Sequence, residues 1–188
     1  SSGLGCAVSE VNNLNDDFEK VFGNVIELCT DAAKTVKNAG PFKSVSDICG
    51  AFHGYLDDLD IEVIYAEIIR VITAPIHEKL VILKLHPDLA GRLAAQGELT
   101  PESTNEQKSA GLDDLTAADK KTIDEILLFR YKEKFGFPFI ICARENKVQS
   151  IIAGLRTRYN NTREEEIYVG IEEVKKICKL RILDIVKD

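Results

Sequence analysis

The chain has 188 residues, of which 45% are hydrophobic and 29% are charged, and its formal net charge at neutral pH is −7. This length and composition are typical of one globular domain with a substantial hydrophobic core. The acidic balance argues against a protein that binds nucleic acid through a basic face. No stretch approaches the roughly 20 apolar residues that a membrane span requires.

The N-terminus lacks the basic-then-apolar order of a signal peptide. We expect residues 1–13 to be flexible and residues 14–188 to form a single helical domain. The five cysteines are odd in number and widely spaced, and they form no C-x-x-C motif, which excludes a disulfide framework and a zinc site. They indicate reduced thiols inside the cell, with Cys29, Cys49 and Cys178 as small core residues.

Apolar residues recur at three- and four-residue steps in the first half of the chain, which predicts amphipathic helices. The stripe from Phe18 to Cys29 predicts one helix that stops before Gly40-Pro41. The following elements are a helix capped by Ser44 or Ser46, a third helix over 61–72, and a short helix from Pro75 to about Leu85.

Residues 86–100 contain proline and glycine and predict an irregular segment. Capping signals then mark three helix starts, and these are Thr100-Pro101-Glu102, Thr116–Asp119 and Thr162–Glu165. Gly111 and Gly136 mark helix ends. We expect a further helix over 147–158.

The apolar run 137–143 is the only strand candidate, since Pro138 disfavours helix at Phe137. One strand does not make a sheet. The predicted fold class is therefore all-α, with a single multi-helix bundle.

His86 stands between an apolar run and the sequence Pro87-Asp88-Leu89-Ala90-Gly91. A histidine changes charge near neutral pH, and a loop after a helix displays functional groups, so His86 is a candidate acid or base. The alternative is a core histidine bound to the backbone. His53 and His77 have no comparable context, and no histidine pair has the i, i+4 spacing of a metal site.

Ser103, Glu106, Gln107 and Ala110 share one face of the predicted helix. That face is polar but ends in a small residue, and the helix N-terminus favours an ionised carboxylate. Glu106 is therefore a candidate acid. The alternative is an ordinary solvated helix surface.

Arg181 falls on the apolar stripe of the last predicted helix, between Cys178 and Ile185. A guanidinium there needs a partner or a ligand, and it suits a carboxylate or a ureido carbonyl. The alternative is a buried stem whose charged end reaches water. The segment Phe137–Ile141 predicts a rigid apolar wall, with plain core as its alternative.

Taken together, these blocks resemble 2-oxo-4-hydroxy-4-carboxy-5-ureidoimidazoline (OHCU) decarboxylases. The likeness runs from about residue 15 to the end of the chain. The blocks that carry it are His86–Gly91, Leu99–Ser103 with Glu106-Gln107 and Ala110-Gly111, Tyr131–Ala143, Arg158 with Asn161 and Glu166, Ile171–Ile177, Leu180-Arg181, and the earlier Phe18, Phe22–Val25 and Pro41-Phe42.

The resemblance implies a role for each matching residue. The catalytic residues of the family fall on His86, Glu106 and Arg181. Its substrate-binding positions fall on Pro87, Ser103, Gln107, Phe139, Ile140 and Ile141. It also implies an all-helical homodimer that binds the small molecule OHCU and converts it to S-allantoin in urate degradation, without cofactor or metal and without nucleic acid or membrane partners.

Two departures from the family pattern stand out. Leu128 occupies a position where members often carry asparagine, and the segment 53–83 is longer and more apolar than expected. The chain ends in Val186-Lys187-Asp188 and lacks the Ser-Lys-Leu peroxisomal address. We expect a cytoplasmic or peroxisomal protein.

Two other functions are compatible with the same scaffold. One is a catalytically inactive helical interaction module, which has no reason to hold His86, Glu106 and Arg181 together. The other is a metal-dependent hydrolase, which the scattered histidines disfavour.

Overall fold

The computed structural model describes residues 5–59, 74–91 and 96–188, with the side chains of 74–77 and 126–128 left out. The chain forms two compact units, one of residues up to 82 together with 175–188, the other of residues 83–174. The predicted helix at 61–72 lies outside the described residues. The prediction of one domain over 14–188 stays a prediction.

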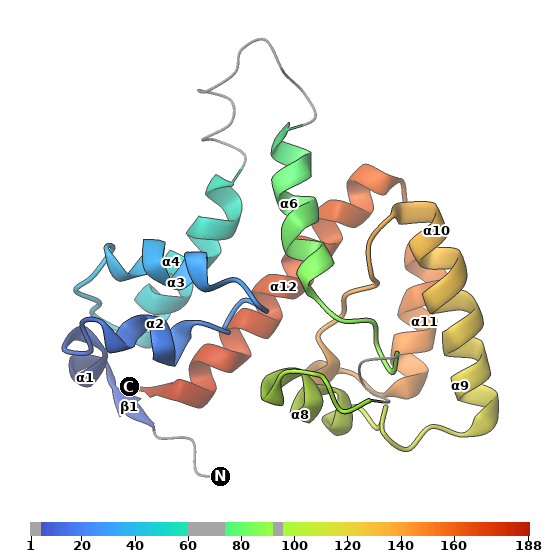
Figure 1. Ribbon diagram of the computed structural model, residues 1–188, viewed down its shortest axis with the longest axis horizontal. Coiled ribbons are helices and arrows are strands. Elements are labelled where there is room, and N and C mark those ends of the chain that lie inside the picture. The colour runs from blue at the N-terminus through green and yellow to red at the C-terminus, as the bar shows by residue number, and fades with distance from the viewer. Residues whose placement is uncertain (1–4, 60–73, 92–95) are drawn as a thin grey trace. The chain divides into compact units, whose positions relative to one another are not determined.

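The first unit contains short helices and one longer one. Its elements are β1 (Cys6–Ala7), α1 (Val8–Asn12), α2 (Asp17–Phe22), α3 (Thr30–Lys37), α4 (Val45–Asp58), most of α6 (Ala74–Leu85), the end of α12 (Arg163–Ile185) and β2 (Val186–Lys187). α3 packs against both α2 and α4 (Figure 1). Its core contains stacked rings of Phe18, Phe22, Phe42 and Phe52.

The predicted helix over Phe18–Cys29 is wrong, because α2 ends at Phe22 and α3 begins at Thr30. Between them Leu28 has a left-handed backbone, with φ of +53°. Its N–H donates to the side-chain carbonyl of Asn24 at 2.8 Å. This local hydrogen bond competes with helix continuation, although the apolar residues still face the core.

The N-terminal segment 1–13, expected to be flexible, contains regular structure from Cys6 to Asn12. β1 pairs in parallel with β2, and Cys6 lies opposite Val186. Val11 is buried. The C-terminal residues therefore supply a pairing partner for this segment. Its expected flexibility stays a prediction.

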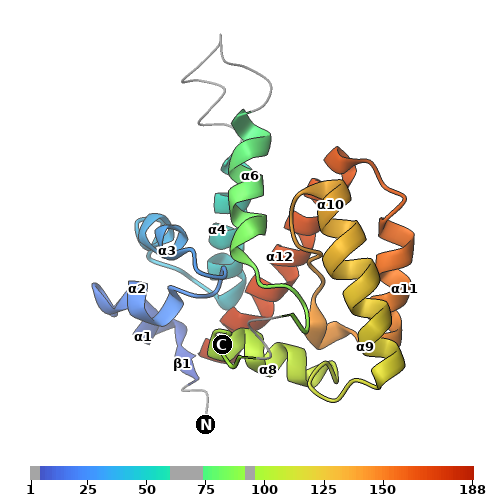
Figure 2. The same cartoon turned by 45° about the vertical axis from the view of Figure 1, so that its right-hand side comes forward.

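The regular elements of the second unit are helices in its described residues (Figure 2). Its elements are α8 (Pro101–Ser109), α9 (Ala117–Ile123), a π-helical stretch at Asp124–Tyr131, α10 (Lys132–Phe135), a 3₁₀ turn at Ala143–Glu145, α11 (Val148–Arg158) and the first part of α12. The prediction of a regular helix through Tyr131 missed the π-helical stretch, because no residue type in the sequence indicates such a stretch. α11 packs against α9.

The predicted caps are confirmed at four helix starts. The side-chain hydroxyls of Ser44, Thr100, Thr116 and Thr162 accept backbone N–H bonds from residues three positions later. In turn, the N–H of Thr162 donates to the side-chain carboxylate of Glu165 at 2.8 Å, which completes a capping box. Pro75 lies in the first turn of α6. The third predicted helix, which Pro75 was expected to end, lies outside the described residues.

The run 137–143 forms no strand; it is buried irregular chain whose last residue, Ala143, begins the 3₁₀ turn. The rings of Phe137 and Phe139, which belong to this run, pack edge-on against the ring of Tyr131. The ring of Phe135 packs against the same tyrosine at a tilted angle. The all-α class is confirmed. In the described ranges, no helix is long and apolar enough to cross a membrane.

Gly136 ends α10 with φ of +80°. We expect Gly136→Ala to lower the free energy of unfolding by about 1 kcal/mol, because a Cβ strains this conformation. Gly50→Ala, inside α4 where a Cβ meets nothing within 4 Å, should raise it by roughly 0.5 to 1 kcal/mol. Urea unfolding of both variants measures the difference. Equal effects at the two positions would contradict this account of the Gly136 turn.

Candidate active site

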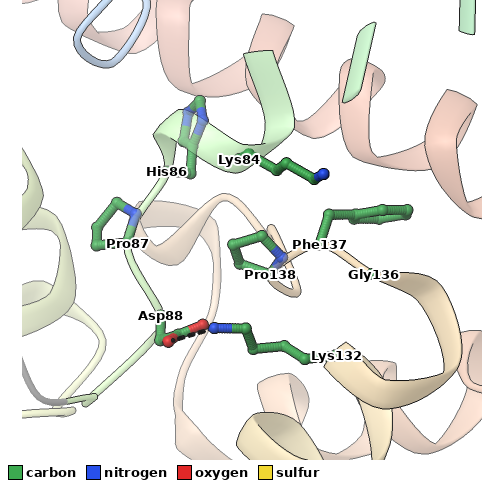
Figure 3. A pocket seen from close by; sticks show the side chains of 8 residues that line it. All are labelled: Lys84, His86, Pro87, Asp88, Lys132, Gly136, Phe137 and Pro138. Carbon is green, nitrogen blue, oxygen red and sulfur yellow. Dashed lines mark hydrogen bonds and ion pairs between the residues drawn. The ribbon is translucent and has the colours of Figure 1, made fainter. Parts of the chain in front are cut away.

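A cavity of about 370 Å³ lies in the second unit beside His86 (Figure 3). Three segments line it, and their residues are Lys84, His86, Pro87, Asp88, Lys132, Gly136, Phe137 and Pro138. Its volume lies within the range of small-molecule sites. The lining contains two lysines and one aspartate, and this excess of positive charge favours an anion.

The segment that follows α6 carries His86, which is 7% exposed. The N–H of His86 donates to the carbonyl of Leu83 at 3.3 Å, so the backbone turns directly after the helix. His86 is buried, as the core alternative predicts, and it also lines the cavity. Its functional role stays a prediction. An acid or base must come within hydrogen-bond reach of a bound molecule, and a side chain that lines a cavity can do so.

Two side chains anchor the turn after His86. Asp88 pairs with Lys132 of α10 at 3.0 Å (Figure 3). Gln107 of α8 accepts the N–H of Ala90 at 3.0 Å through its side-chain carbonyl. A Cβ at Gly91 would lie 2.8 Å from the Cβ of Asp88, so the turn closes only with glycine. The His86-Pro87 segment is thus fixed from both sides.

The face of α8 predicted to be functional is buried. Ser103, Glu106 and Gln107 are all less than 10% exposed. A solvated surface, the alternative for this face, is therefore wrong. Gln107 has a structural role, because its side chain accepts the N–H of Ala90. The sequence did not indicate this role.

The predicted wall Phe139–Ile141 is held by a buried guanidinium. Arg158 of α11 donates from Nη1 to the carbonyl of Ile140 at 2.6 Å. Its guanidinium carbon lies 4.2 Å from the centre of the Phe139 ring. The carbonyl of Ile140 is therefore engaged inside the core, and this fixes the orientation of its neighbouring peptide groups.

Glu166 neutralises that guanidinium. Its Oε1 accepts from Arg158 Nε at 2.6 Å and from the hydroxyl of Tyr131 at 2.6 Å. Its Oε2 accepts from the side chain of Asn161 at 3.0 Å. Glu166 is completely buried, and a buried carboxylate requires this many donors.

Two groups in this region have raised pKa values. Burial and then the hydrogen bond to Glu166 raise the pKa of Tyr131 far above its ordinary range, so its hydroxyl stays a donor. Burial, followed by the charge of Glu145, raises the pKa of the Cys142 thiol to about 11. Cys142 is therefore a neutral core residue at physiological pH.

Arg181 belongs to the first unit and is 4% exposed. Its Nη1 donates to the Glu27 carboxylate at 2.7 Å and to the carbonyl of Asn24 at 2.8 Å. The alternative in which its charged end reaches water is wrong. Glu27 was missed, although an acid within Val25-Ile26-Glu27-Leu28-Cys29 was a signal of a buried partner.

The structure brings His86 and Pro87 to one cavity. Within the described lining of that cavity, Ser103, Glu106, Gln107 and the wall residues do not appear. The convergence of Arg181 with His86 and Glu106 stays a prediction. Sequence reasoning missed the contribution of Asp88 and Lys132 to the site.

Among the residues that the structure describes, no group of three or more His, Cys, Asp and Glu side chains could hold a metal ion. The side chain of Leu128, one of the departures from the family pattern, lies outside the described atoms.

Comparison with known proteins gives consistent results. Residues 12–183 match the family model described as OHCU decarboxylase. The 2-oxo-4-hydroxy-4-carboxy-5-ureidoimidazoline decarboxylase of Xenopus laevis is 38% identical over 179 residues, which cover 95% of this chain and 93% of that protein. The decarboxylase of Mus musculus with the same name is 35% identical over 177 residues, or 94% and 90% of the two chains.

Two solved structures share the fold. A crystal structure of (S)-allantoin synthase matches with a TM-score of 0.69 and 20% identity, and the match covers 96% of this chain and 54% of that one. A crystal structure of OHCU decarboxylase in the presence of (S)-allantoin matches with a TM-score of 0.59 and 22% identity, over 89% and 94% of the chains.

The Glu166 network predicts a large loss of stability on Glu166→Gln. Removing the charge leaves the buried Arg158 without its counter-ion, so we expect a loss of about 3 to 5 kcal/mol. Asp124→Asn, which removes the exposed pair with Lys120, is the matched control, with an expected change of less than about 0.5 kcal/mol. Urea unfolding compares the two, and a similar small loss in both would contradict the role given to Glu166.

Proposed function

Because this chain belongs to the OHCU decarboxylase family, we propose that it releases CO₂ from OHCU and forms (S)-allantoin in urate degradation. The observation that carries the proposal is the match over residues 12–183, since it includes every residue to which a role is assigned. The buried histidine on a cavity of suitable size supports it independently.

The substrate itself can accept the electrons of the broken bond. Its carboxylate is attached to a hydroxyl-bearing ring carbon, and the neighbouring carbon that carries the ureido group belongs to an imine. When the carbon–carbon bond breaks, CO₂ leaves and the electron pair passes into that imine. One proton then adds to the former imine nitrogen and a second to the ureido-bearing carbon, while the hydroxyl gives up its proton and its carbon becomes the carbonyl of allantoin, so that one proton is taken up overall.

The protein has three tasks in this reaction. It holds the carboxylate out of the ring plane, stabilises the negative charge that develops on the ring, and directs the proton to one face. An enzyme of this kind works with binding and proton transfer, without pyridoxal, thiamine or metal. Delivery to one face makes the product a single enantiomer.

His86 is the proposed acid or base. It contacts the substrate hydroxyl or carboxylate and takes part in proton transfer. Pro87 shapes the adjacent wall of the site. The Asp88–Lys132 pair and the Gln107–Ala90 bond support this geometry, since they restrain the turn directly after His86.

Glu106 is proposed to orient His86 or to accept the ureido N–H groups. Its neighbours Ser103 and Gln107 bind polar atoms of the substrate from the same buried helix face. Burial strengthens such hydrogen bonds because water competes with them less.

Arg181 and the wall complete the proposed site. Arg181 holds an anionic or carbonyl oxygen of the substrate through its fork of N–H groups. The backbone groups of Phe139, Ile140 and Ile141 are proposed to bind the ligand as well. Arg158 restrains that backbone through the Ile140 carbonyl.

We also propose that the protein is a homodimer, that it is located in the cytoplasm or the peroxisome, and that OHCU is its small-molecule partner. The cysteines support a reducing compartment, because Cys6, Cys29, Cys49, Cys142 and Cys178 are all free thiols.

The proposal predicts that the purified protein accelerates CO₂ release from freshly prepared OHCU and yields one enantiomer of allantoin. His86→Ala should lower kcat by at least about 10²-fold, because a general acid or base contributes that much or more. The assay couples urate oxidation and hydrolysis to the protein and follows CO₂ release and the circular dichroism of the product.

Histidine 53 provides the matched control. His53 contacts the backbone carbonyl of Lys175 in α12 and has no proposed catalytic role, so His53→Ala should retain activity. The far-ultraviolet spectrum of both variants should match that of the wild type. Full activity in a folded His86→Ala variant would show that the assignment of His86 is wrong. A racemic product from the wild type would contradict the proposed function.

A further inference from the structure

We propose that Lys84 binds the carboxylate of OHCU, so that His86 meets the hydroxyl on the same ring carbon. The inference rests on the proposed function and deepens it, because it decides which group of the substrate each of the two side chains contacts. Neither the sequence patterns nor the family likeness singled out Lys84.

The first observation is the balance of charge in the cavity beside His86. The lysine and aspartate side chains in its described lining are Lys84, Asp88 and Lys132. Asp88 and Lys132 form an ion pair at 3.0 Å, and the ammonium of Lys84 lies apart from that pair (Figure 3). Because the pair cancels its own charge, Lys84 supplies the net positive charge of these three side chains.

The second observation is that the ammonium of Lys84 keeps its donors for a ligand. Among the residues that the structure describes, it has no hydrogen bond and no ion pair. Lys134 of the same unit, in contrast, donates to the backbone carbonyl of Tyr159. An ammonium carries three N–H donors, and a carboxylate is the acceptor that binds them most strongly.

The third observation is the placement of Lys84 relative to His86. The N–H of His86 donates to the carbonyl of Leu83, and this turn encloses Lys84 and fixes the spacing of the two backbones. Lys84 is exposed and His86 is buried, yet both line the cavity. The cavity therefore reaches from solvent at the lysine to the interior at the histidine.

This arrangement suits the proposed reaction. A carboxylate held at the exposed lysine leaves as CO₂ toward solvent, while the ring lies deeper, beside the histidine. The hydroxyl and the carboxylate of OHCU are attached to one carbon, so neighbouring side chains can bind them at the same time. His86 then takes part in proton transfer at the hydroxyl.

A lysine near the end of a helix has a second candidate role. Lys84 lies in the last turn of α6, where a positive charge interacts favourably with the helix dipole. That role affects the stability of the helix and leaves the affinity for a carboxylate unchanged. The product (S)-allantoin separates the two roles, because it has lost the carboxylate as CO₂.

The carboxylate role predicts that Lys84→Gln raises KM for OHCU about tenfold, the effect of one charge-assisted hydrogen bond. The value of kcat should not fall. The negative charge of the carboxylate disappears as CO₂ forms, so a cation beside it stabilises the substrate more than the transition state. Lys84→Arg keeps the charge and should keep KM within about threefold of the wild type.

Two controls accompany these kinetics. Isothermal titration calorimetry with (S)-allantoin should give the same dissociation constant for Lys84→Gln and the wild type, because the product lacks the group that Lys84 binds. Lys121→Gln is the matched variant, since Lys121 is an exposed lysine of α9 in the same unit, pairs with Glu125 at 3.9 Å and has no proposed role. Its KM should equal that of the wild type, whereas an effect of net charge alone would appear in both variants.

A measurement on the unmodified protein covers the case in which a variant does not fold. Added sodium chloride should raise KM for OHCU, because salt screens an exposed ion pair, and it should leave the dissociation constant of (S)-allantoin in place.

The role of Lys84 would be overturned by a wild-type KM in Lys84→Gln, an equal rise of KM in Lys121→Gln, a parallel loss of affinity for (S)-allantoin, or a KM that does not respond to salt. A wild-type protein that releases no CO₂ from OHCU would instead contradict the proposed function itself.

Discussion

The buried carboxylate of Glu166 is the constraint on which the second compact unit depends. It accepts hydrogen bonds from Tyr131, Arg158 and Asn161, which come from three parts of the chain. Burying this charge is costly, so the unit is stable only when all these donors are in place. The requirement locks the π-helical stretch, the end of α11 and the start of α12 into one arrangement.

The same constraint reaches the predicted wall through Arg158. The guanidinium that neutralises Glu166 also binds the carbonyl of Ile140 and lies on the ring of Phe139. A segment that forms no strand ladder thereby acquires a fixed backbone. The arginine supplies the hydrogen bond that a neighbouring strand supplies in a sheet.

A second buried pair, Arg181 with Glu27, occurs in the first unit. Buried ion pairs are weak evidence for stability, because hydrophobic residues of similar size often do as well. They fix orientation, however, since both partners must keep their hydrogen bonds. A decarboxylase without a cofactor needs fixed orientation, because its rate enhancement comes from holding the carboxylate and placing donors near developing charge.

The sequence by itself determined the elements whose signals are local. The hydroxyl caps at Ser44, Thr100, Thr116 and Thr162, and the glycine at 136, are read from a few neighbouring residues. The family likeness, carried by blocks in a set order, identified the all-α class and the candidate residues His86, Glu106 and Arg181. Hydrophobic periodicity, in contrast, joined α2 and α3 wrongly, because the same apolar stripe serves a helix and a folded loop.

Only the tertiary structure decided which charges meet. Glu27 and Arg181 are separated by 154 positions, and Asp88 and Lys132 by 44. Neither pair has a local signal, because a carboxylate in a sequence carries no record of the distant cation that neutralises it. The pairing also settled that Arg181 is buried, while periodicity alone left burial and solvent contact equally open. The physical reason is that helix caps depend on adjacent backbone groups, whereas buried charges depend on packing between segments far apart in the chain.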